Sequence, residues 1–276
     1  MLQKFFKYHG AGNDFLLADN LDGRLSLSAS QVRRLCDRHR GFGADGVMLL
    51  ERSDSRDFRM VFFNPDGSSG MMCGNGGRCI VAFASDTGVV SGKFPVVFEA
   101  PDGCHTANII STGPEKEIRL GMNPVRGILP FPEDNACFLD TGARHLVKFV
   151  EGVGDYPVRS EGKMLRSDPR FAPEGTNVDF VEVVAGGEGT LLKVRTFEKG
   201  VEDETLACGT GIVASAVAAF SMGVPPTASD GCRVSYCIRA SVADLKVDFM
   251  PEAQGFASDV WLTGPATFVG TVECFL

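Results

Sequence analysis

One short pattern occurs twice in this chain, and each copy opens an apolar stretch. Cys73-Gly74-Asn75-Gly76 begins the first stretch, and Cys208-Gly209-Thr210-Gly211 begins the second, 135 residues later. A strand-like run ending in an aromatic residue precedes each copy, with Phe63 in the first case and Phe197 in the second. Both patterns therefore predict the same unit, a strand, a polar loop and an apolar helix, present in two copies.

A third similarity lies in the same order along the chain. Gly12-Asn13-Asp14-Phe15 is similar to Thr176-Asn177-Val178-Asp179-Phe180. We take it as further support for a duplicated unit.

Most of the remaining sequence predicts short strands, because β-branched and aromatic runs alternate with Gly, Pro, Asp or Ser. Strands are expected at residues 4–8, 47–51, 57–63, 94–99, 146–150, 177–184, 191–197, 234–239 and 245–249. Helices are expected at residues 28–39, 75–85 and 210–222, and Ser28 with Gln31 forms a capping box for the first.

The second and third of these helices are apolar almost all round, which favours burial inside a sheet. The expected fold is α+β, with two pseudo-symmetric halves, each a mixed β-sheet curled around a central helix. The Pro- and Gly-rich residues 121–132 mark the boundary. We expect an N-terminal half at residues 1–120 plus 264–276, with the Cys73 motif, and a C-terminal half at residues 121–263, with the Cys208 motif.

Charge and cysteine usage exclude several classes of protein. The 276 residues carry a net charge of −8, which argues against nucleic acid or an anionic membrane as a partner. The nine cysteines are odd in number and include no CxxC pair, which argues against a disulfide framework and a zinc site. No leader-like segment opens the sequence, and no apolar run approaches the ~20 residues of a membrane span. We therefore expect a cytoplasmic protein.

A cysteine at the start of a helix has unusual chemistry. The unpaired N–H groups and the partial positive charge of a helix N-terminus favour a thiolate, which is a competent base near neutral pH. The same N–H groups, here those of Gly74, Asn75, Gly209 and Thr210, can bind a carboxylate. Phosphate binding is a rival interpretation, but neither copy continues as the Gly-Lys-Ser/Thr of a P-loop.

Two such helix starts on opposite sides of one carboxylate would invert an α-carbon. One sulfur removes the α-proton as thiolate, and the other delivers a proton to the opposite face as thiol. The helix dipoles stabilise the growing negative charge of the carboxylate. No lysine motif indicates a pyridoxal site, so we expect no cofactor and no metal.

The motifs resemble those of the diaminopimelate epimerase family over nearly the whole chain. The matching segments are residues 8–15, 63–68, 72–79, 175–178 and 204–211. Proline and hydroxyproline racemases share the two-cysteine fold, but the flanking motifs favour the diaminopimelate branch.

The resemblance implies roles for particular residues. Cys73 and Cys208 would be the acid/base pair, with His145 and Glu198 as polar neighbours that assist the two sulfurs. The resemblance also implies a set of substrate-binding residues, Asn13, Asn64, Gly74, Asn75, Asn177, Lys199, Gly209 and Thr210. Asparagine is common in turns, so Asn13, Asn64 and Asn177, each taken alone, would be interpreted as turn residues. The other histidines, His9, His39 and His105, are expected to be structural.

The sequence departs from the family pattern in three places. Gly142-Ala143-Arg144-His145 stands where members usually have Asn or Ser and then Pro before the histidine, and Arg144 is a candidate for the lost substrate contact. Lys199 replaces the usual arginine, and a point charge is no substitute for a planar fork. The segment between Glu198 and Cys208 is one residue longer than the commonest form.

These observations leave three hypotheses. The first is interconversion of LL- and meso-diaminopimelate for lysine and peptidoglycan precursor synthesis, by a homodimer that binds a small amino acid. The second keeps the mechanism but changes the substrate to another amino acid, such as histidine or a lanthionine-like compound. The third is a non-enzymatic, redox-sensitive anion-binding module.

Overall fold

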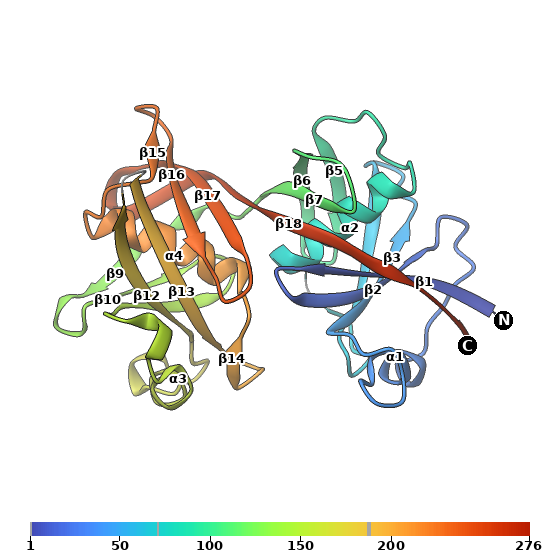
Figure 1. Cartoon of the computed structure of the whole chain (residues 1–276), viewed down its shortest axis with the longest axis horizontal. Helices are drawn as coiled ribbons and strands as arrows, with labels where there is room; N and C mark the ends of the chain where they lie inside the picture. The colour runs from blue at the N-terminus through green and yellow to red at the C-terminus, as the bar shows by residue number, and fades with distance from the viewer. Residues whose placement is uncertain (1, 71, 187–188) are drawn as a thin grey trace. The chain divides into compact units, whose positions relative to one another are not determined.

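The computed structural model describes residues 2–70, 72–186 and 189–276. Contacts within the chain divide it into two compact units, which we name by their motifs (Figure 1). The Cys73 unit comprises Met1–Leu120 with Gly264–Leu276, and the Cys208 unit comprises Gly121–Thr263. In the described part of the chain, no helix is both long and apolar enough to cross a membrane.

The Cys73 unit is a mixed sheet around one buried helix. Its strands are β1 (Leu2–Gly10), β2 (Asn13–Asp19), β3 (Gly46–Glu51), β4 (Phe58–Phe63), β5 (Val96–Ala100), β6 (Gly103–Ile109), β7 (Glu115–Gly121) and the second part of β18 (Phe256–Phe275). The central helix is α2 (Gly74–Asp86), which contacts β1, β2, β3 and β6. All of its residues from Gly74 to Ala84 are buried, as the apolar sequence predicts.

The Cys208 unit has the same plan. Its strands are β8 (Val125–Arg126), β9 (Ile128–Phe131), β10 (Ala136–Asp140), β11 (Arg144–Phe149), β12 (Asn177–Gly186), β13 (Gly189–Glu198), β14 (Asp203–Thr205), β15 (Ala228–Ser229), β16 (Val234–Arg239), β17 (Asp244–Pro251) and the first part of β18. The central helix α4 (Gly209–Ser221) contacts β10, β11, β12, β13, β16 and β17, and strands surround it in Figure 1. Single 3-10 turns lie at Pro132–Asp134, Val153–Asp155, Pro169–Phe171 and Ala253–Gly255.

The order of strand pairing shows that one unit repeats the other. From β1 to β7, successive strands pair antiparallel, parallel, antiparallel, parallel, antiparallel and antiparallel. The series β10, β11, β12, β13, β16, β17 and β18 pairs in the same order. α2 and α4 occupy equivalent connections, β4 to β5 and β13 to β16. The predicted α+β fold with two pseudo-symmetric halves is confirmed.

The same register corrects the third predicted similarity. Asn13 begins β2, whose counterpart is β11, whereas Asn177 begins β12, whose counterpart is β3. The two asparagines therefore do not occupy equivalent positions. By register, Gly46 is the counterpart of Asn177, and their partners on the preceding strand, Phe15 and His145, are counterparts of each other.

The remaining helices occupy the connections from β2 to β3 and from β11 to β12. α1 (Ala29–Cys36) has the predicted capping box of Ser28 and Gln31, but it ends before residue 39 because the backbone at Asp37 is extended. α3 (Val158–Arg166) was not predicted. Gly162 lowers its helix propensity, and a Cβ there would collide with Phe197.

Candidate active site

Cys73 is the N-cap residue of α2. Its backbone is extended, and its sulfur accepts a hydrogen bond from the Gly76 N–H at 3.3 Å. A Cβ added at Gly76 would lie 3.3 Å from this sulfur, so the glycine leaves room for the sulfur over the first turn. The thiol is half-buried, which keeps it within reach of a small molecule. This is the geometry expected of a sulfur stabilised as a thiolate.

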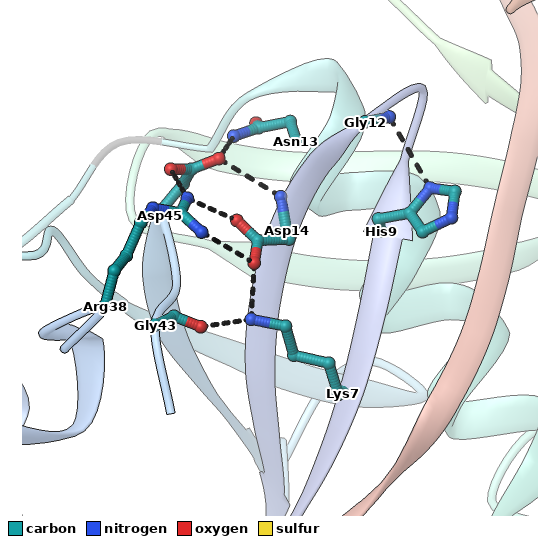
Figure 2. Close-up of polar contacts among 8 residues, drawn as sticks. All are labelled: Lys7, His9, Gly12, Asn13, Asp14, Arg38, Gly43 and Asp45. Atoms are coloured by element: carbon teal, nitrogen blue, oxygen red, sulfur yellow. Dashed lines mark hydrogen bonds and ion pairs between the residues drawn. The ribbon is translucent and has the colours of Figure 1, made fainter. Parts of the chain in front are cut away.

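A network of charged side chains holds Asn13 in place (Figure 2), and its amide oxygen lies near this sulfur. Asn13 Nδ2 donates to Asp45 Oδ2 at 2.7 Å, which turns Asn13 Oδ1 toward Cys73 Sγ at 3.9 Å. Arg38 pairs with both Asp45 and Asp14, and Lys7 also pairs with Asp14. Although burial alone would raise the pKa of Asp14, hydrogen bonds from Arg38 and Lys7 lower it. Because Arg38 holds the Asp45 carboxylate in place, the Asn13 amide keeps one orientation.

A fully buried arginine lies beneath the same helix start. The Arg78 guanidinium donates to Asn75 Oδ1 at 2.8 Å, to Gly74 O at 3.2 Å and to Pro265 O at 3.3 Å. Gly74 and Asn75 are the residues whose N–H groups we expect to bind a carboxylate. Arg78 thus fixes the Asn75 side chain and places a positive charge within the first turn of α2.

Asn64 lies in the turn that follows β4. Its Nδ2 donates to Ser68 Oγ at 3.0 Å and to Ser69 O at 3.4 Å. These contacts are those of a turn residue, and the predicted role of Asn64 toward a substrate stays a prediction. His9 likewise accepts a hydrogen bond from the Gly12 N–H at 3.5 Å within the β1–β2 turn (Figure 2).

In the other unit, a chain of hydrogen bonds leads from Cys208 into the core. Cys208 Sγ lies 3.4 Å from Thr210 Oγ1, and that oxygen lies 2.9 Å from His145 Nε2. His145 Nδ1 lies 2.7 Å from Asp179 Oδ2, and both side chains are completely buried. Thr196 Oγ1 donates to the second oxygen of Asp179 at 2.7 Å. The structure thus joins the predicted residues His145, Thr210 and Cys208 through direct contacts.

Asn177 shows which nitrogen of His145 carries the proton. The backbone N–H of Lys199 donates to Asn177 Oδ1 at 2.8 Å, so the Asn177 amide must direct its NH₂ group toward His145 Nε2, 3.4 Å away. The hydrogen-bond network therefore assigns Nε2 as an acceptor and Nδ1–H as the donor to the Asp179 carboxylate.

The charges near Cys208 differ from those near Cys73. Burial raises the pKa of the Cys208 thiol well above its usual range, and the negative charges of Glu198 and Asp179 raise it further. The backbone of Gly211 opposes this shift, but its effect is smaller. At neutral pH the sulfur of Cys208 is a thiol, which is the form that can donate a proton.

The residues at the departures from the family pattern meet at Glu174. Arg144 Nη1 pairs with the Glu174 carboxylate at 2.7 Å and donates to Phe171 O at 3.2 Å. Lys199 Nζ donates to Glu174 O at 3.0 Å. The sequence suggests that Arg144 contacts the substrate. In this structure Glu174 already occupies the Arg144 guanidinium and would compete with a substrate carboxylate for it.

Sequence reasoning missed three residues that complete these arrangements, Asp45, Arg78 and Asp179. The signal for Asp179 was a single carboxylate in the otherwise apolar strand of residues 178–181. Arg78 lay inside a recognised segment and Asp45 outside all of them, and neither carried a spacing that distinguished it from a surface charge. Among the described residues, no group of three or more His, Cys, Asp or Glu side chains is arranged to hold a metal ion.

Comparison with known proteins identifies the family. The family model described as diaminopimelate epimerase matches residues 5–126 and 137–230. Diaminopimelate epimerase of Flavobacterium psychrophilum is 40% identical over 270 residues, covering 96% of this chain and 98% of the relative. The chain belongs to the diaminopimelate epimerase family. The enzyme of that name from Chlorobaculum tepidum is 41% identical over 268 residues, covering 95% of this chain and 98% of the relative.

Solved structures of other proteins share the fold of this diaminopimelate epimerase family member. A phenazine biosynthesis protein of the PhzF family from Bacillus anthracis superposes with a TM-score of 0.75 at 14% identity, with complete coverage of both chains. A hydroxyproline epimerase from Agrobacterium vitis gives a TM-score of 0.67 at 16% identity, covering 99% of this chain and 92% of that one. Family membership makes the chain an isomerase, and the non-enzymatic hypothesis is set aside.

Proposed function

We propose that this protein interconverts LL- and meso-diaminopimelate by two-base proton transfer between Cys73 and Cys208. Membership of the diaminopimelate epimerase family carries the substrate assignment. The sulfur at the start of each central helix, Cys73 on α2 and Cys208 on α4, supports the mechanism. Each unit contributes one motif, and we propose that each is one domain of the enzyme.

The chemistry follows from the surroundings of each sulfur. A thiolate removes the α-proton, while the opposite thiol protonates the other face, and the two exchange roles in the reverse reaction. The N–H groups at the two helix starts would bind the substrate carboxylate, whose charge grows as the α-proton leaves. His145 and Glu198 would adjust the proton affinity of the sulfurs, and Asn13, Asn64 and Asn177 would hold the polar groups of the substrate.

Solvent exchange tests the function directly. Reduced protein incubated with LL-diaminopimelate in deuterated water should place deuterium at one α-carbon while the meso isomer accumulates. Mass spectrometry and chiral chromatography follow the two changes together. Absence of both in correctly folded, reduced protein would contradict the proposal.

A second candidate keeps this mechanism and changes the substrate. Arg144 and Lys199, which replace family residues, are bound to Glu174. A changed distal subsite could accept histidine or a lanthionine-like amino acid. Measuring deuterium exchange over a panel of amino acids distinguishes the two candidates. Faster exchange with another amino acid than with diaminopimelate would favour the second.

Four finer expectations accompany the proposal. The reaction would serve lysine and peptidoglycan precursor synthesis, and its place would be the cytoplasm. The family resemblance implies a homodimer, which sedimentation of the purified protein would test. The mechanism needs no pyridoxal phosphate, so catalysis should survive dialysis against a carbonyl reagent.

A further inference from the structure

The buried Arg78 guanidinium is held by neutral hydrogen-bond acceptors. Among the described residues, no carboxylate forms an ion pair with it, and its donors face the neutral oxygens of Gly74, Asn75 and Pro265. Burial of a charge without a counterion costs free energy. Its position is also unfavourable for α2, because a cation near a helix N-terminus opposes the helix dipole.

An anion at the tip of α2 would compensate both costs. Arg78 lies in the second turn of α2, and side chains of a helix lean toward its N-terminus, which brings the guanidinium to the first turn. Burial lowers the pKa of Arg78, while the negative charges of Cys79 and Cys73 act in the opposite direction. Burial also raises the pKa of Cys79 far above its usual range, which leaves Cys73 as the sulfur able to ionise.

The other sulfur has the opposite surroundings. Nε2 of His145 carries no proton, so the hydroxyl of Thr210, 2.9 Å away, is the donor in their contact. The oxygen of Thr210 is then free to accept, and the group facing it is the S–H of Cys208. The nearby carboxylates Asp179 and Glu198 disfavour a negative sulfur.

We propose that Arg78 holds Cys73 as the thiolate in the resting protein, while the Asp179–His145–Thr210 chain holds Cys208 as the thiol. Arg78 is a positioning residue, since it acts on the sulfur and on Asn75 rather than on substrate. The groups near Cys73 include Asn13 on β2, the Gly76 N–H, and Arg78 and Cys79 on α2. The Asn13 oxygen would favour a thiol, but at 3.9 Å its contact is longer than that of the Gly76 N–H at 3.3 Å.

The proposal rests on the proposed function for its meaning in turnover, but its test needs no substrate. Full-length reduced protein is alkylated with iodoacetamide across a series of pH values. Peptides that carry Cys73 and Cys208 are followed separately by mass spectrometry. The midpoint of each rate curve reports ionisation of one sulfur, whatever its exposure.

In the unsubstituted protein the Cys73 curve should have its midpoint below that of Cys208. Arg78→Gln, which keeps an amide donor but removes the charge, should move the Cys73 midpoint up by about one pH unit, a tenfold loss of thiolate near neutral pH. Arg78→Lys should retain most of the thiolate. The Cys208 curve should stay in place in both variants.

Lys116→Met is the matched control, because it also removes a buried cation from the same unit. Lys116 pairs with Asp86 at the far end of α2, roughly 18 Å from Gly74 by the rise of the helix. It should destabilise the protein without moving the Cys73 curve.

An unchanged Cys73 curve in folded Arg78→Gln would overturn the proposal. So would a Cys208 midpoint below that of Cys73 in the unsubstituted protein, a comparison that stands even if the Gln variant fails to fold. Deuterium exchange tests the function separately, so the two can fail independently.

Discussion

The two helix starts occupy the same place in a repeated sheet, yet the side chains beneath them differ in charge. A Cβ added at Gly76 would lie 3.5 Å from the sulfur of Met48 on β3. A Cβ added at its counterpart, Gly211, would overlap the Asp179 carboxylate on β12. Met48 pairs with Phe62, and Asp179 pairs with Thr196, so the two occupy equivalent strand positions.

The charged position also differs between the two helices: the Cys73 unit has a cation on its helix where the Cys208 unit has an apolar residue. Arg78 on α2 corresponds to Val213 on α4 by the spacing of the two cysteine motifs. The Cys73 unit thus combines an apolar strand position with a cation on the helix, and the Cys208 unit combines an anion on the strand with an apolar helix. Duplication supplies two similar sulfurs, and substitution of two equivalent positions gives them different proton affinities.

Further polar residues around each sulfur lie at the starts of equivalent strands. Asn13 and Asp45 meet where β2 and β3 begin, and His145 and Asn177 meet where β11 and β12 begin. The Cys73 unit uses an amide fixed by an acid, whereas the Cys208 unit uses an imidazole fixed by an amide. A two-base enzyme that starts with one thiolate and one thiol needs such a difference.

The largest effect is expected from removing the buried Asp179 carboxylate, the charge that distinguishes the Cys208 unit from the Cys73 unit. Asp179→Asn keeps the shape of the side chain but removes the charge that holds the proton on His145 Nδ1. We expect kcat to fall about 10²-fold, the contribution of one positioned acid or base. Stability to urea should fall by about 2 kcal/mol, because a charge-assisted hydrogen bond is lost.

Thr196→Val is the control for Asp179→Asn. It removes the donor to the other oxygen of Asp179 and leaves His145 untouched. A comparable loss of stability is expected, with kcat close to that of the unsubstituted protein. Equal loss of kcat in both variants would show that Asp179 acts through stability alone.

Glu198→Gln sharpens the comparison through pH. Burial and the charge of Glu198 both raise the pKa of Cys208, so removal of this charge should lower that pKa. We expect the alkylation curve of Cys208 to move down by about one pH unit, a tenfold rise in thiolate at a given pH. Glu204→Gln, which breaks the ion pair with Arg195 on the neighbouring strand, should leave the curve in place.

The smallest expected effect concerns the charged network in Figure 2. Asp45→Ala frees the amide of Asn13 to rotate, and the loss of one hydrogen bond should raise KM roughly three- to tenfold with kcat nearly constant. Asp57→Ala removes another carboxylate of the same unit, which binds Lys93 and the Val97 N–H. An equal rise of KM in Asp57→Ala would show that the orientation of the Asn13 amide is not the cause of the effect.

Much of the fold could be predicted from the sequence because its signals are local. Apolar runs gave most of the strands, and the two Cys-Gly-x-Gly motifs gave α2 and α4. α3 was missed because Gly162 weakens the helix pattern, although it occupies the connection equivalent to that of α1. The repeat was visible in the cysteine motifs but misread at Asn13 and Asn177, because strand equivalence depends on pairing, which short similarities do not encode.

The site was predictable where a motif marked it and hidden where tertiary contacts create it. Cys73 and Cys208 stand at helix starts as the motifs predict. Asp179, by contrast, acquires its role from a contact with His145, 34 positions away in the chain. Arg78 is adjacent to the motif, but only its complete burial distinguishes it from an ordinary helix arginine.

The central claim, inversion by two separate sulfurs, is tested most directly by where solvent hydrogen enters during the first turnovers. The protein is incubated briefly with LL-diaminopimelate in deuterated water. Recovered substrate and meso product are then separated, and the deuterium content of each is measured by mass spectrometry. Two sulfurs predict deuterium in nearly all of the product and almost none in the recovered substrate, because the new hydrogen comes from the opposite thiol. Equal deuterium in both, or product that retains the original hydrogen, would mean that one group serves both faces.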